Sequence, residues 1–180
     1  MSVHFILAIY SVFQVCLNIE GIRMRKVIIN SIDKQKNNSD HKWLDIEKIA
    51  AVEVTSEQEA FPVEFALLPG KGPEWRASGE GKQVIRLIFD NPQKLQWIRL
   101  KFEELEVERT QEYVLRCSQD SGQSFQEIVR QQWNFSPEGA TSEIEDYQVD
   151  LPEVTILELS INPDISKRNA FASLKELRLA

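Results

Sequence analysis

Two short clusters of aromatic, cationic and amide side chains hold most of the binding chemistry that this sequence offers. The first consists of Lys71, Trp75 and Arg76, in a stretch rich in glycine and proline. A flat indole ring can stack on the apolar face of a sugar, while a cation can donate hydrogen bonds to the hydroxyl groups. The same residues also fit a structural role, in which Trp75 closes one end of the protein core and Arg76 faces water.

The second cluster falls just past a predicted strand and contains Arg130, Gln132, Trp133 and Asn134. Planar amide and guanidinium groups can pair with the hydroxyl groups of a sugar or with peptide groups. The cluster carries too little positive charge to suit a phosphate backbone. The alternative is a strand end in which Trp133 and Phe135 pack inward and the polar side chains face water.

Residues for catalysis or metal binding are sparse. The chain has two histidines, two cysteines and no Cys-x-x-Cys or His-Glu-x-x-His motif, which excludes zinc ribbons and zincins. It also lacks the glycine-rich phosphate loops of nucleotide-binding proteins. Glu138, Glu143, Glu145 and Asp146 supply carboxylates for a glycosidase pair, but no apolar pocket is predicted to raise the pKa of one of them. We therefore predict that the protein is not an enzyme.

The composition is that of a folded protein of one domain with an acidic surface. The 180 residues are 42% hydrophobic and 27% charged, with a net charge of −7, values that fit neither a disordered nor a fibrous chain. This charge argues against nucleic acid or an anionic membrane as a partner. Residues 103–108 include four glutamates and are predicted to form an open, solvated loop because like charges repel. Cys117, in an alternating apolar segment, is predicted to be buried and unpaired.

The N-terminal region is apolar without matching a standard targeting segment. Residues 3–17 form an apolar run of about 15 residues, short of the ~20 that span a bilayer. The first Lys or Arg is Arg23, whereas a secretory signal has its positive charge before the apolar run. We hypothesise that residues 1–23 are an upstream extension, that Met24 is the working start, and that residues 24–180 form a single cytoplasmic binding domain. The alternatives are an atypical signal, which would export the protein, and a genuine part of the fold.

From about residue 49 onward, apolar and polar residues alternate in short runs separated by Gly, Pro, Asn, Asp and Ser. Alternation with one apolar face is typical of antiparallel strands. The predicted strands cover residues 49–54, 61–67, 84–89, 95–102, 110–118, 125–131, 144–151, 155–161 and 174–179. Short helices are predicted at residues 44–48 and 166–172. The pattern predicts an all-β, antiparallel β-sandwich of about eight strands in a jelly-roll arrangement.

The alternation also predicts which side chains point into the core. In four of the predicted strands, every second residue is large and apolar while its neighbours are mostly polar. The predicted inward residues are Ile85, Leu87, Phe89, Ile98, Leu100, Phe102, Tyr113, Leu115, Cys117, Leu157, Leu159 and Ile161. Burial of each large apolar side chain contributes roughly 1.5–3 kcal/mol, which is ample for an independent core before conformational entropy is subtracted.

Several short motifs follow one another in a characteristic order. Trp-Arg-Ala-Ser occupies residues 75–78, an alternating run ends in Asp at residues 85–90, and an Arg precedes a strand and a Ser-x-Asp turn at residues 109–122. Leu-Lys-Glu-Leu follows at residues 174–177. This order resembles the discoidin or coagulation-factor C-type domain family, whose fold is the galactose-binding-like β-sandwich. The resemblance covers roughly residues 43–180.

The resemblance implies a non-catalytic module that binds carbohydrate through loops at one end of the sandwich. The residues of the two clusters described above would then contact the ligand. The segment Trp-Arg-Ala is also similar to the N-terminal domain of a DNA-repair scaffold protein with the same sandwich, which binds other proteins. An intracellular protein–protein interaction module is therefore the alternative function.

The resemblance also raises the question of a structural calcium ion. Domains of this family often hold one through an early Asp-Gly-Asp turn and a late acidic residue. Here residues 67–74 contain Lys71 and no Asp, while Glu176 matches the late acidic position. Calcium prefers six to eight oxygen ligands. We therefore expect no cofactor, with a structural calcium ion at Glu176 as the alternative.

Overall fold

The computed structural model describes residues 41–180. The hypotheses about residues 1–23 and about a start at Met24 concern residues outside the described part. Between residues 41 and 180, no helix is long and apolar enough to cross a membrane.

Eight strands and two one-turn helices follow one another along the described part of the chain. In chain order they are α1 (Ile46–Ile49), β1 (Ala50–Val54), α2 (Glu64–Leu67), β2 (Trp75–Glu80), β3 (Gln83–Glu103), β4 (Arg109–Ser118), β5 (Gln126–Phe135), β6 (Ser142–Asn162), β7 (Phe171–Leu174) and β8 (Glu176–Leu179). The strands pair in antiparallel fashion. The all-β, antiparallel class predicted from the alternation is therefore confirmed.

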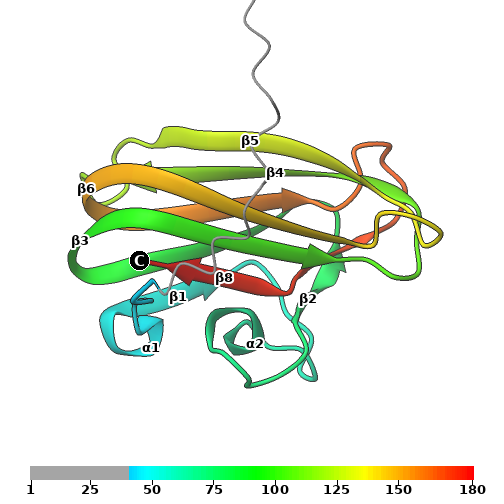
Figure 1. The fold of residues 1–180 in the computed structure, drawn as a ribbon, viewed down its shortest axis with the longest axis horizontal. Helices are drawn as coiled ribbons and strands as arrows, with labels where there is room; N and C mark the ends of the chain where they lie inside the picture. The colour runs from blue at the N-terminus through cyan, green and yellow to red at the C-terminus, as the bar shows by residue number, and fades with distance from the viewer. Residues whose placement is uncertain (1–40) are drawn as a thin grey trace, which may run out of the picture. The chain divides into compact units, whose positions relative to one another are not determined.

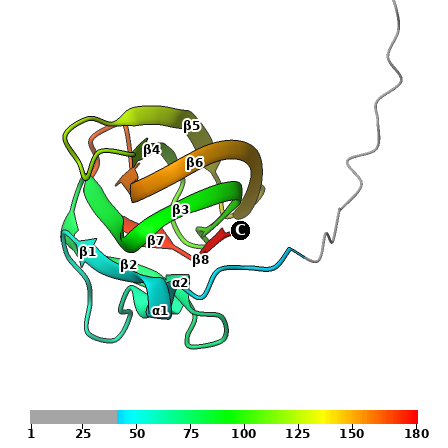
Figure 2. The same ribbon diagram turned by 90° about the vertical axis from the view of Figure 1, so that its left-hand side faces the viewer.

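β3 and β6 run through both layers of the sandwich, because each spans 21 residues and bends near its middle. The first half of β3 lies between β1 and the second half of β6, and β4 and β5 extend this layer. The second half of β3 lies between β8 and the first half of β6. Figure 1 shows the long strands side by side, and Figure 2 shows them surrounding a common core.

The bend of β3 corrects the expectation of two separate strands in this region. Asp90, Asn91 and Pro92 do not end the strand, because pairing with β6 becomes irregular there and then resumes. Pro92 has no amide hydrogen to donate, and a local loss of pairing lets a strand change direction. β6 is likewise continuous where two strands are predicted, and its bend contains Glu153 with a positive φ of 53°.

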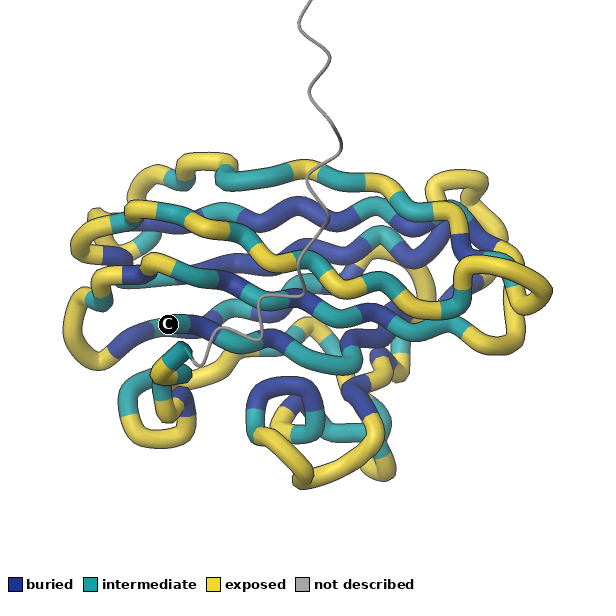
Figure 3. Tube along the Cα trace, viewed as in Figure 1, coloured by how far each residue is buried: buried dark blue, intermediate teal, exposed yellow. Residues whose placement is uncertain are grey.

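The predicted core is confirmed in full. All twelve residues predicted to point inward are buried, and none is more than 6% exposed. Cys117 is among them and is a free cysteine. Figure 3 shows buried positions running through the middle of the long strands, with exposed positions concentrated in the loops.

The segment 61–67 forms no strand but ends in the helical turn α2. Val63, Ala66 and Leu67 are its buried residues, and their spacing of three and four positions brings them to one face of a helix. The same residues read as an apolar run in the sequence, which is why a strand is predicted there. The helix predicted at residues 44–48 is present as α1, displaced by one or two residues.

The segment 166–172 forms no helix. Lys167 adopts a positive φ of 60° within a loop, and Phe171 begins the short strand β7, which pairs with β2. Neither β2 nor β7 is predicted as a separate strand, since each is short and neither has a clear apolar alternation.

A ladder of alternating charges crosses the first layer of the sandwich on the side opposite the core. One residue from each strand lines up across the sheet, in the order Glu53, Arg86, Glu158, Arg116 and Glu127 from β1 to β5. The Glu158 side chain is 1% exposed and accepts hydrogen bonds from Arg86, at 2.7 Å, and from Arg116. Burial alone would raise the pKa of Glu158, but these hydrogen bonds outweigh it and hold the pKa below its ordinary value.

Trp43 fixes the beginning of the described region to the last strand. The guanidinium groups of Arg99 and Arg178 lie 5.3 and 5.6 Å from the centre of its ring. The amide of Leu44 donates a hydrogen bond of 2.7 Å to the carbonyl oxygen of Leu179. Residues 43 and 44 therefore anchor the chain where it enters the sandwich.

Replacing Trp43 by alanine should lower the free energy of unfolding by about 1–2 kcal/mol, since each cation–π contact near the surface contributes roughly 0.5–1 kcal/mol. Replacing the exposed neighbour Lys42 by alanine should change it by less than about 0.5 kcal/mol. Urea unfolding followed by circular dichroism measures both variants. Equal effects of the two changes would contradict the anchoring role of Trp43.

Candidate functional site

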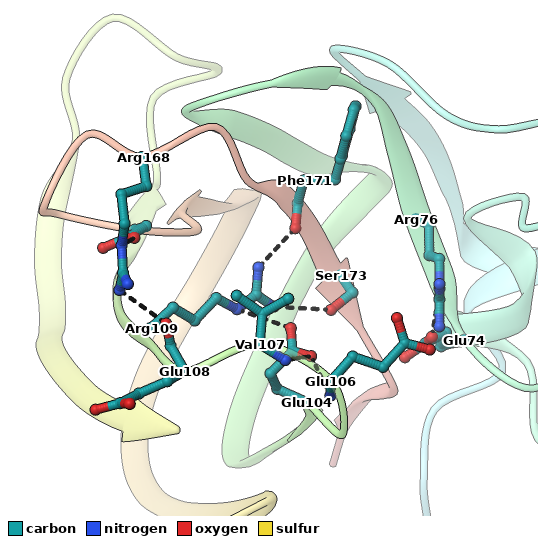
Figure 4. A network of polar contacts seen from close by, with 11 residues as sticks. Glu74, Arg76, Glu104, Glu106, Val107, Glu108, Arg109, Arg168, Phe171 and Ser173 are labelled. Atoms are coloured by element: carbon teal, nitrogen blue, oxygen red, sulfur yellow. Dashed lines mark hydrogen bonds and ion pairs between the residues drawn. The ribbon is translucent and has the colours of Figure 1, made fainter. Parts of the chain in front are cut away.

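A cleft of about 230 Å³ opens at the end of the sandwich where β3 ends and β7 begins. One wall is the acidic loop, residues 103–108, which leads from β3 to β4. The other wall is formed by residues 169–173, with Arg76 of β2 nearby (Figure 4). The lining residues are Gln58, Glu74, Arg76, Glu103, Glu104, Leu105, Glu106, Val107, Arg109, Asn169, Ala170, Phe171, Ala172 and Ser173.

Arg109 connects the two walls of the cleft. Its side chain is 4% exposed, and its Nη1 and Nη2 donate hydrogen bonds to the carbonyl oxygen of Phe171, at 2.7 Å, and to the hydroxyl of Ser173, at 3.4 Å. Its Nε lies 3.0 Å from a carboxylate oxygen of Glu104. Burial lowers the pKa of Arg109 and the charge of Glu104 opposes this change, but an arginine stays protonated in either case. One guanidinium group thus joins β4, β7 and the acidic loop.

Residues 105–108 of the acidic loop are exposed, as expected for a solvated loop, but the loop is folded back on itself and is not open. The carboxylate of Glu104 accepts hydrogen bonds from the backbone amides of Glu106 and Val107, at 2.9 and 3.1 Å. Glu103 pairs with Lys175 at 2.8 Å. Arg109 of β4 and Lys175, which lies between β7 and β8, offset the repulsion among the glutamates of this loop.

The loop between β6 and β7 is fastened to the acidic loop by Arg168. Its Nε donates to the carboxylate of Asp164 at 2.6 Å, and its Nη2 donates to the carbonyl oxygen of Glu108 at 2.7 Å. Asp164 also accepts a hydrogen bond of 2.9 Å from the amide of Ser166. Burial alone would raise the pKa of Asp164, but these hydrogen bonds lower it. Hydrogen bonds therefore hold both loops that shape the cleft.

Three apolar side chains stand exposed around the cleft. Leu105, Val107 and Phe171 are 62%, 50% and 46% exposed, although large apolar residues are usually buried. Single exposed apolar residues are common, whereas three around one cleft make it a candidate binding surface. The cleft thus combines an aromatic face and aliphatic groups with charged hydrogen-bonding groups.

Of the first predicted cluster, only Arg76 lines the cleft. Its Nε donates to Glu74 at 2.6 Å and its guanidinium lies 4.9 Å from the centre of the Phe61 ring, while the side chain is 45% exposed. Trp75 is fully buried, so its indole belongs to the core and cannot stack on a ligand, which corrects its assignment as a binding residue. Lys71 is exposed in the glycine-rich loop but does not line the cleft.

The second predicted cluster lies within β5, not in a loop beyond a strand. Alternation along β5 leaves Arg130, Gln132 and Asn134 exposed on one face and turns Trp133 to the other, where it packs against the core. Arg130 and Gln132 donate hydrogen bonds to Glu112, at 3.2 and 2.9 Å. The strand therefore divides the cluster between two faces, and none of its residues lines the cleft.

Several solved structures that are similar to this chain are carbohydrate-binding modules. A family 32 module (CBM32) of Clostridium perfringens CpGH89, in complex with GalNAc-β-1,3-galactose, has a TM-score of 0.56 and 19% identity, covering 76% of this chain and 98% of its own. The family 32 module of C. perfringens NanJ, in complex with galactose, has a TM-score of 0.54 and 15% identity, covering 76% of this chain and 96% of its own. CBM32-3 from a family 31 glycoside hydrolase of the same organism has a TM-score of 0.57 and 18% identity, covering 76% of this chain and 93% of its own. The chain has the galactose-binding-like β-sandwich fold.

The galactose-binding-like fold confirms the architecture predicted from the alternation and from the order of the short motifs. No protein-family profile matches the chain, and no curated protein matches its sequence. The likeness to family 32 modules therefore lies in the three-dimensional arrangement of the strands.

Within the galactose-binding-like sandwich, Glu176 lies in β8 among cationic side chains. Its partner across the strand pair is Lys101, and both line a small pocket with Lys175 and Arg178. Residues 41–180 contain no group of three or more His, Cys, Asp or Glu side chains that could hold a metal ion. Calcium needs six to eight oxygen ligands, so the residues around Glu176 do not fit it.

Arg109 and Phe171 line the cleft but are not among the predicted binding residues, and Arg109 enters the prediction only as a landmark in the order of motifs. Arg109 occupies an inward position in the alternation of β4, and a cation at an inward position directly after an acidic run is a signal that points to a buried ion pair. Leu105 and Val107 are a second signal, because apolar residues inside an acidic loop need a reason to be there. The sequence around Phe171 does not indicate a binding role, since Phe171 begins a strand of only four residues.

Proposed function

We propose that this domain binds carbohydrate without catalysing a reaction, and that the sugar occupies the cleft between the acidic loop and the start of β7. The observation that carries the proposal is the exposed ring of Phe171 beside a cleft of about 230 Å³ whose walls carry guanidinium and carboxylate groups. Structures of the same fold in complex with galactose and with GalNAc-β-1,3-galactose support this class of ligand.

The groups around the cleft match the two kinds of surface that a sugar presents. The ring of Phe171 offers a flat apolar surface for the face of a pyranose. Arg76 has donors to spare beyond its bond to Glu74, and the carboxylate of Glu106 accepts hydrogen bonds from hydroxyl groups. The cleft is smaller than the roughly 300–1,000 Å³ of pockets for drug-sized ligands, so it suits the end of a glycan.

The carboxylates deep in the cleft favour binding over hydrolysis. Glu74 lies 2.6 Å from Arg76, and Glu104 lies 3.0 Å from Arg109. A glycosidase needs one carboxyl group that stays protonated as the acid and a second that is charged. Both carboxylates are occupied by arginines of the protein, so neither is free to approach a glycosidic bond.

Replacing Phe171 by alanine should weaken sugar binding about tenfold, since an aromatic contact contributes up to about 1.5 kcal/mol and 1.4 kcal/mol is a factor of ten. Val52 provides the control, because it is 37% exposed in β1 and does not line the cleft. Val52→Ala should leave the affinity unchanged. A glycan array identifies a ligand, and calorimetric titration then compares the variants. A blank array for the folded protein, or equal losses in both variants, would contradict the proposal.

A protein partner is the second candidate, and the exposed aliphatic side chains of Leu105 and Val107 favour it. Sugars stack on aromatic rings, whereas aliphatic groups at a cleft rim suit an apolar side chain of a peptide. Co-purification of one protein in stoichiometric amount, its loss on Leu105→Asp, and a blank glycan array would together establish this alternative.

A further inference from the structure

We infer that the cleft prefers sugars that carry a protonated amino group, and that Glu106 determines this specificity. The inference rests on the proposed function, because it concerns which sugar the cleft accepts. Its starting point is the charge of the lining residues, which include four glutamates and two arginines. A chitosan-binding module of Paenibacillus sp. IK-5 has a similar fold, but which residue of this chain would select an amino sugar follows only from the cleft itself.

Most of the charge in the cleft is already neutralised. Three of the four glutamates have a cationic partner, in the pairs Glu74–Arg76, Glu104–Arg109 and Glu103–Lys175, at 2.6, 3.0 and 2.8 Å. Each of the two arginines of the cleft is thereby paired with a carboxylate of the protein, so its charge is balanced even where it has further donors for hydroxyl groups. What is left is the charge of the fourth glutamate.

Glu106 is that fourth glutamate. It is exposed, and within residues 41–180 its carboxylate takes part in no ion pair or side-chain hydrogen bond. Its backbone is fixed, because its amide donates a hydrogen bond of 2.9 Å to Glu104. Figure 4 shows its side chain extending toward Arg76 and Glu74, whereas the side chain of Glu108 extends away from the cleft.

A carboxylate in the cleft without an ion-pair partner discriminates between sugars by their charge. A protonated amine donates a charge-assisted hydrogen bond to Glu106, and such bonds are roughly twice as strong as those between neutral groups. An N-acetylated amine is neutral and loses this gain. The carboxylate of a uronic acid adds a second negative charge next to Glu106 and is repelled.

The test compares three oligosaccharides of equal length, titrated into the full chain below the pKa of the sugar amine. They are a chitosan oligosaccharide with free amines, its N-acetylated chitin counterpart, and an oligogalacturonate. We expect chitosan to bind about tenfold more tightly than chitin, and this difference should shrink as salt is added. Oligogalacturonate should bind most weakly of the three. Glu106→Gln should remove both the preference and its salt dependence. Glu108→Gln, in the same loop but outside the cleft lining, should retain both.

The outcomes distinguish a failure of the role inferred for Glu106 from a failure of the proposed sugar binding. Equal affinity for chitosan and chitin, or a preference that survives Glu106→Gln, overturns the role of Glu106 and leaves sugar binding in place. The same holds if a neutral glycan binds, Phe171→Ala weakens it, and chitosan does not bind. Failure of every glycan to bind the folded protein overturns both the inference and the proposed function.

Discussion

Replacing Glu158 by glutamine is expected to lower the free energy of unfolding by about 3 kcal/mol. The change leaves the guanidinium groups of Arg86 and Arg116 without the carboxylate that accepts a hydrogen bond from each. Removal of one partner from a buried ion pair costs about 3–5 kcal/mol. We expect the low end of this range, because the arginine side chains are 43% and 39% exposed and water screens part of their charge.

Glu53 supplies the matched control, since it stands at the exposed end of the same charge ladder. Its side chain is 59% exposed and lies 3.5 Å from Arg86. Exposed ion pairs contribute about 0–1 kcal/mol, so Glu53→Gln should have an effect in that range. Urea unfolding at neutral pH measures both variants. Similar small losses for Glu53→Gln and Glu158→Gln would show that the ladder does not tie the strands together.

Acid should remove the same stabilisation from the unaltered protein. The pKa of Glu158 is lower in the folded state than in the unfolded chain, where a glutamate titrates at about 4.3. Its contribution is therefore complete above that value and is lost as the pH falls through the folded-state pKa. Because glutamine does not titrate, the stability difference between the two proteins should shrink below about pH 4. A difference that stays constant down to the acid limit of folding would refute this assignment.

Replacing Arg109 by methionine should destabilise the domain by about 3 kcal/mol and abolish binding in the cleft. Methionine fills a similar space but cannot donate to the carbonyl of Phe171 or to Ser173. It also leaves the carboxylate of Glu104, which is 14% exposed, without its cation. Glu104 would then no longer be held in place to accept the amide of Glu106, so the acidic loop would lose its fixed shape.

The loss of affinity should exceed that of Phe171→Ala, because Arg109→Met disturbs both walls of the cleft. We expect more than about a hundredfold, which corresponds to about 2.7 kcal/mol. Arg109→Lys retains the charge without the planar set of donors, and its effects should be intermediate. Calorimetric titration and urea unfolding measure the two effects, and hydrogen exchange at the amides of Glu106 and Val107 reports on the loop. Wild-type affinity in a folded Arg109→Met variant would place the binding site elsewhere.

The sequence predicts the core better than the strand boundaries, for a physical reason. Successive side chains of a strand point to opposite faces, so a run such as Ile85, Leu87 and Phe89 defines its buried face without reference to the rest of the chain. Turn residues do not show whether a strand ends or only bends at their position. Asp90 and Pro92 have the same local preferences in a bend as at a strand end, and the bend became visible only with the pairing to β6.

The candidate site could be predicted less well than the fold. Trp75 and Arg76 are neighbours in the sequence, and alternation along β2 buries the first and exposes the second. The sequence offers both as binding residues because it does not show which one faces water. Alternation along β5 likewise places Trp133 and Asn134 on opposite faces of the strand.

By itself, the sequence determined an antiparallel β-sandwich and the twelve side chains at its centre, because burial in a strand repeats every second residue. Only the tertiary structure decided where a ligand can bind. Arg109 and Phe171 are 62 residues apart, and they meet because the start of β4 lies against β7, which pairs with β2. Which loops come together depends on long-range strand pairing, and no local pattern of residues encodes it.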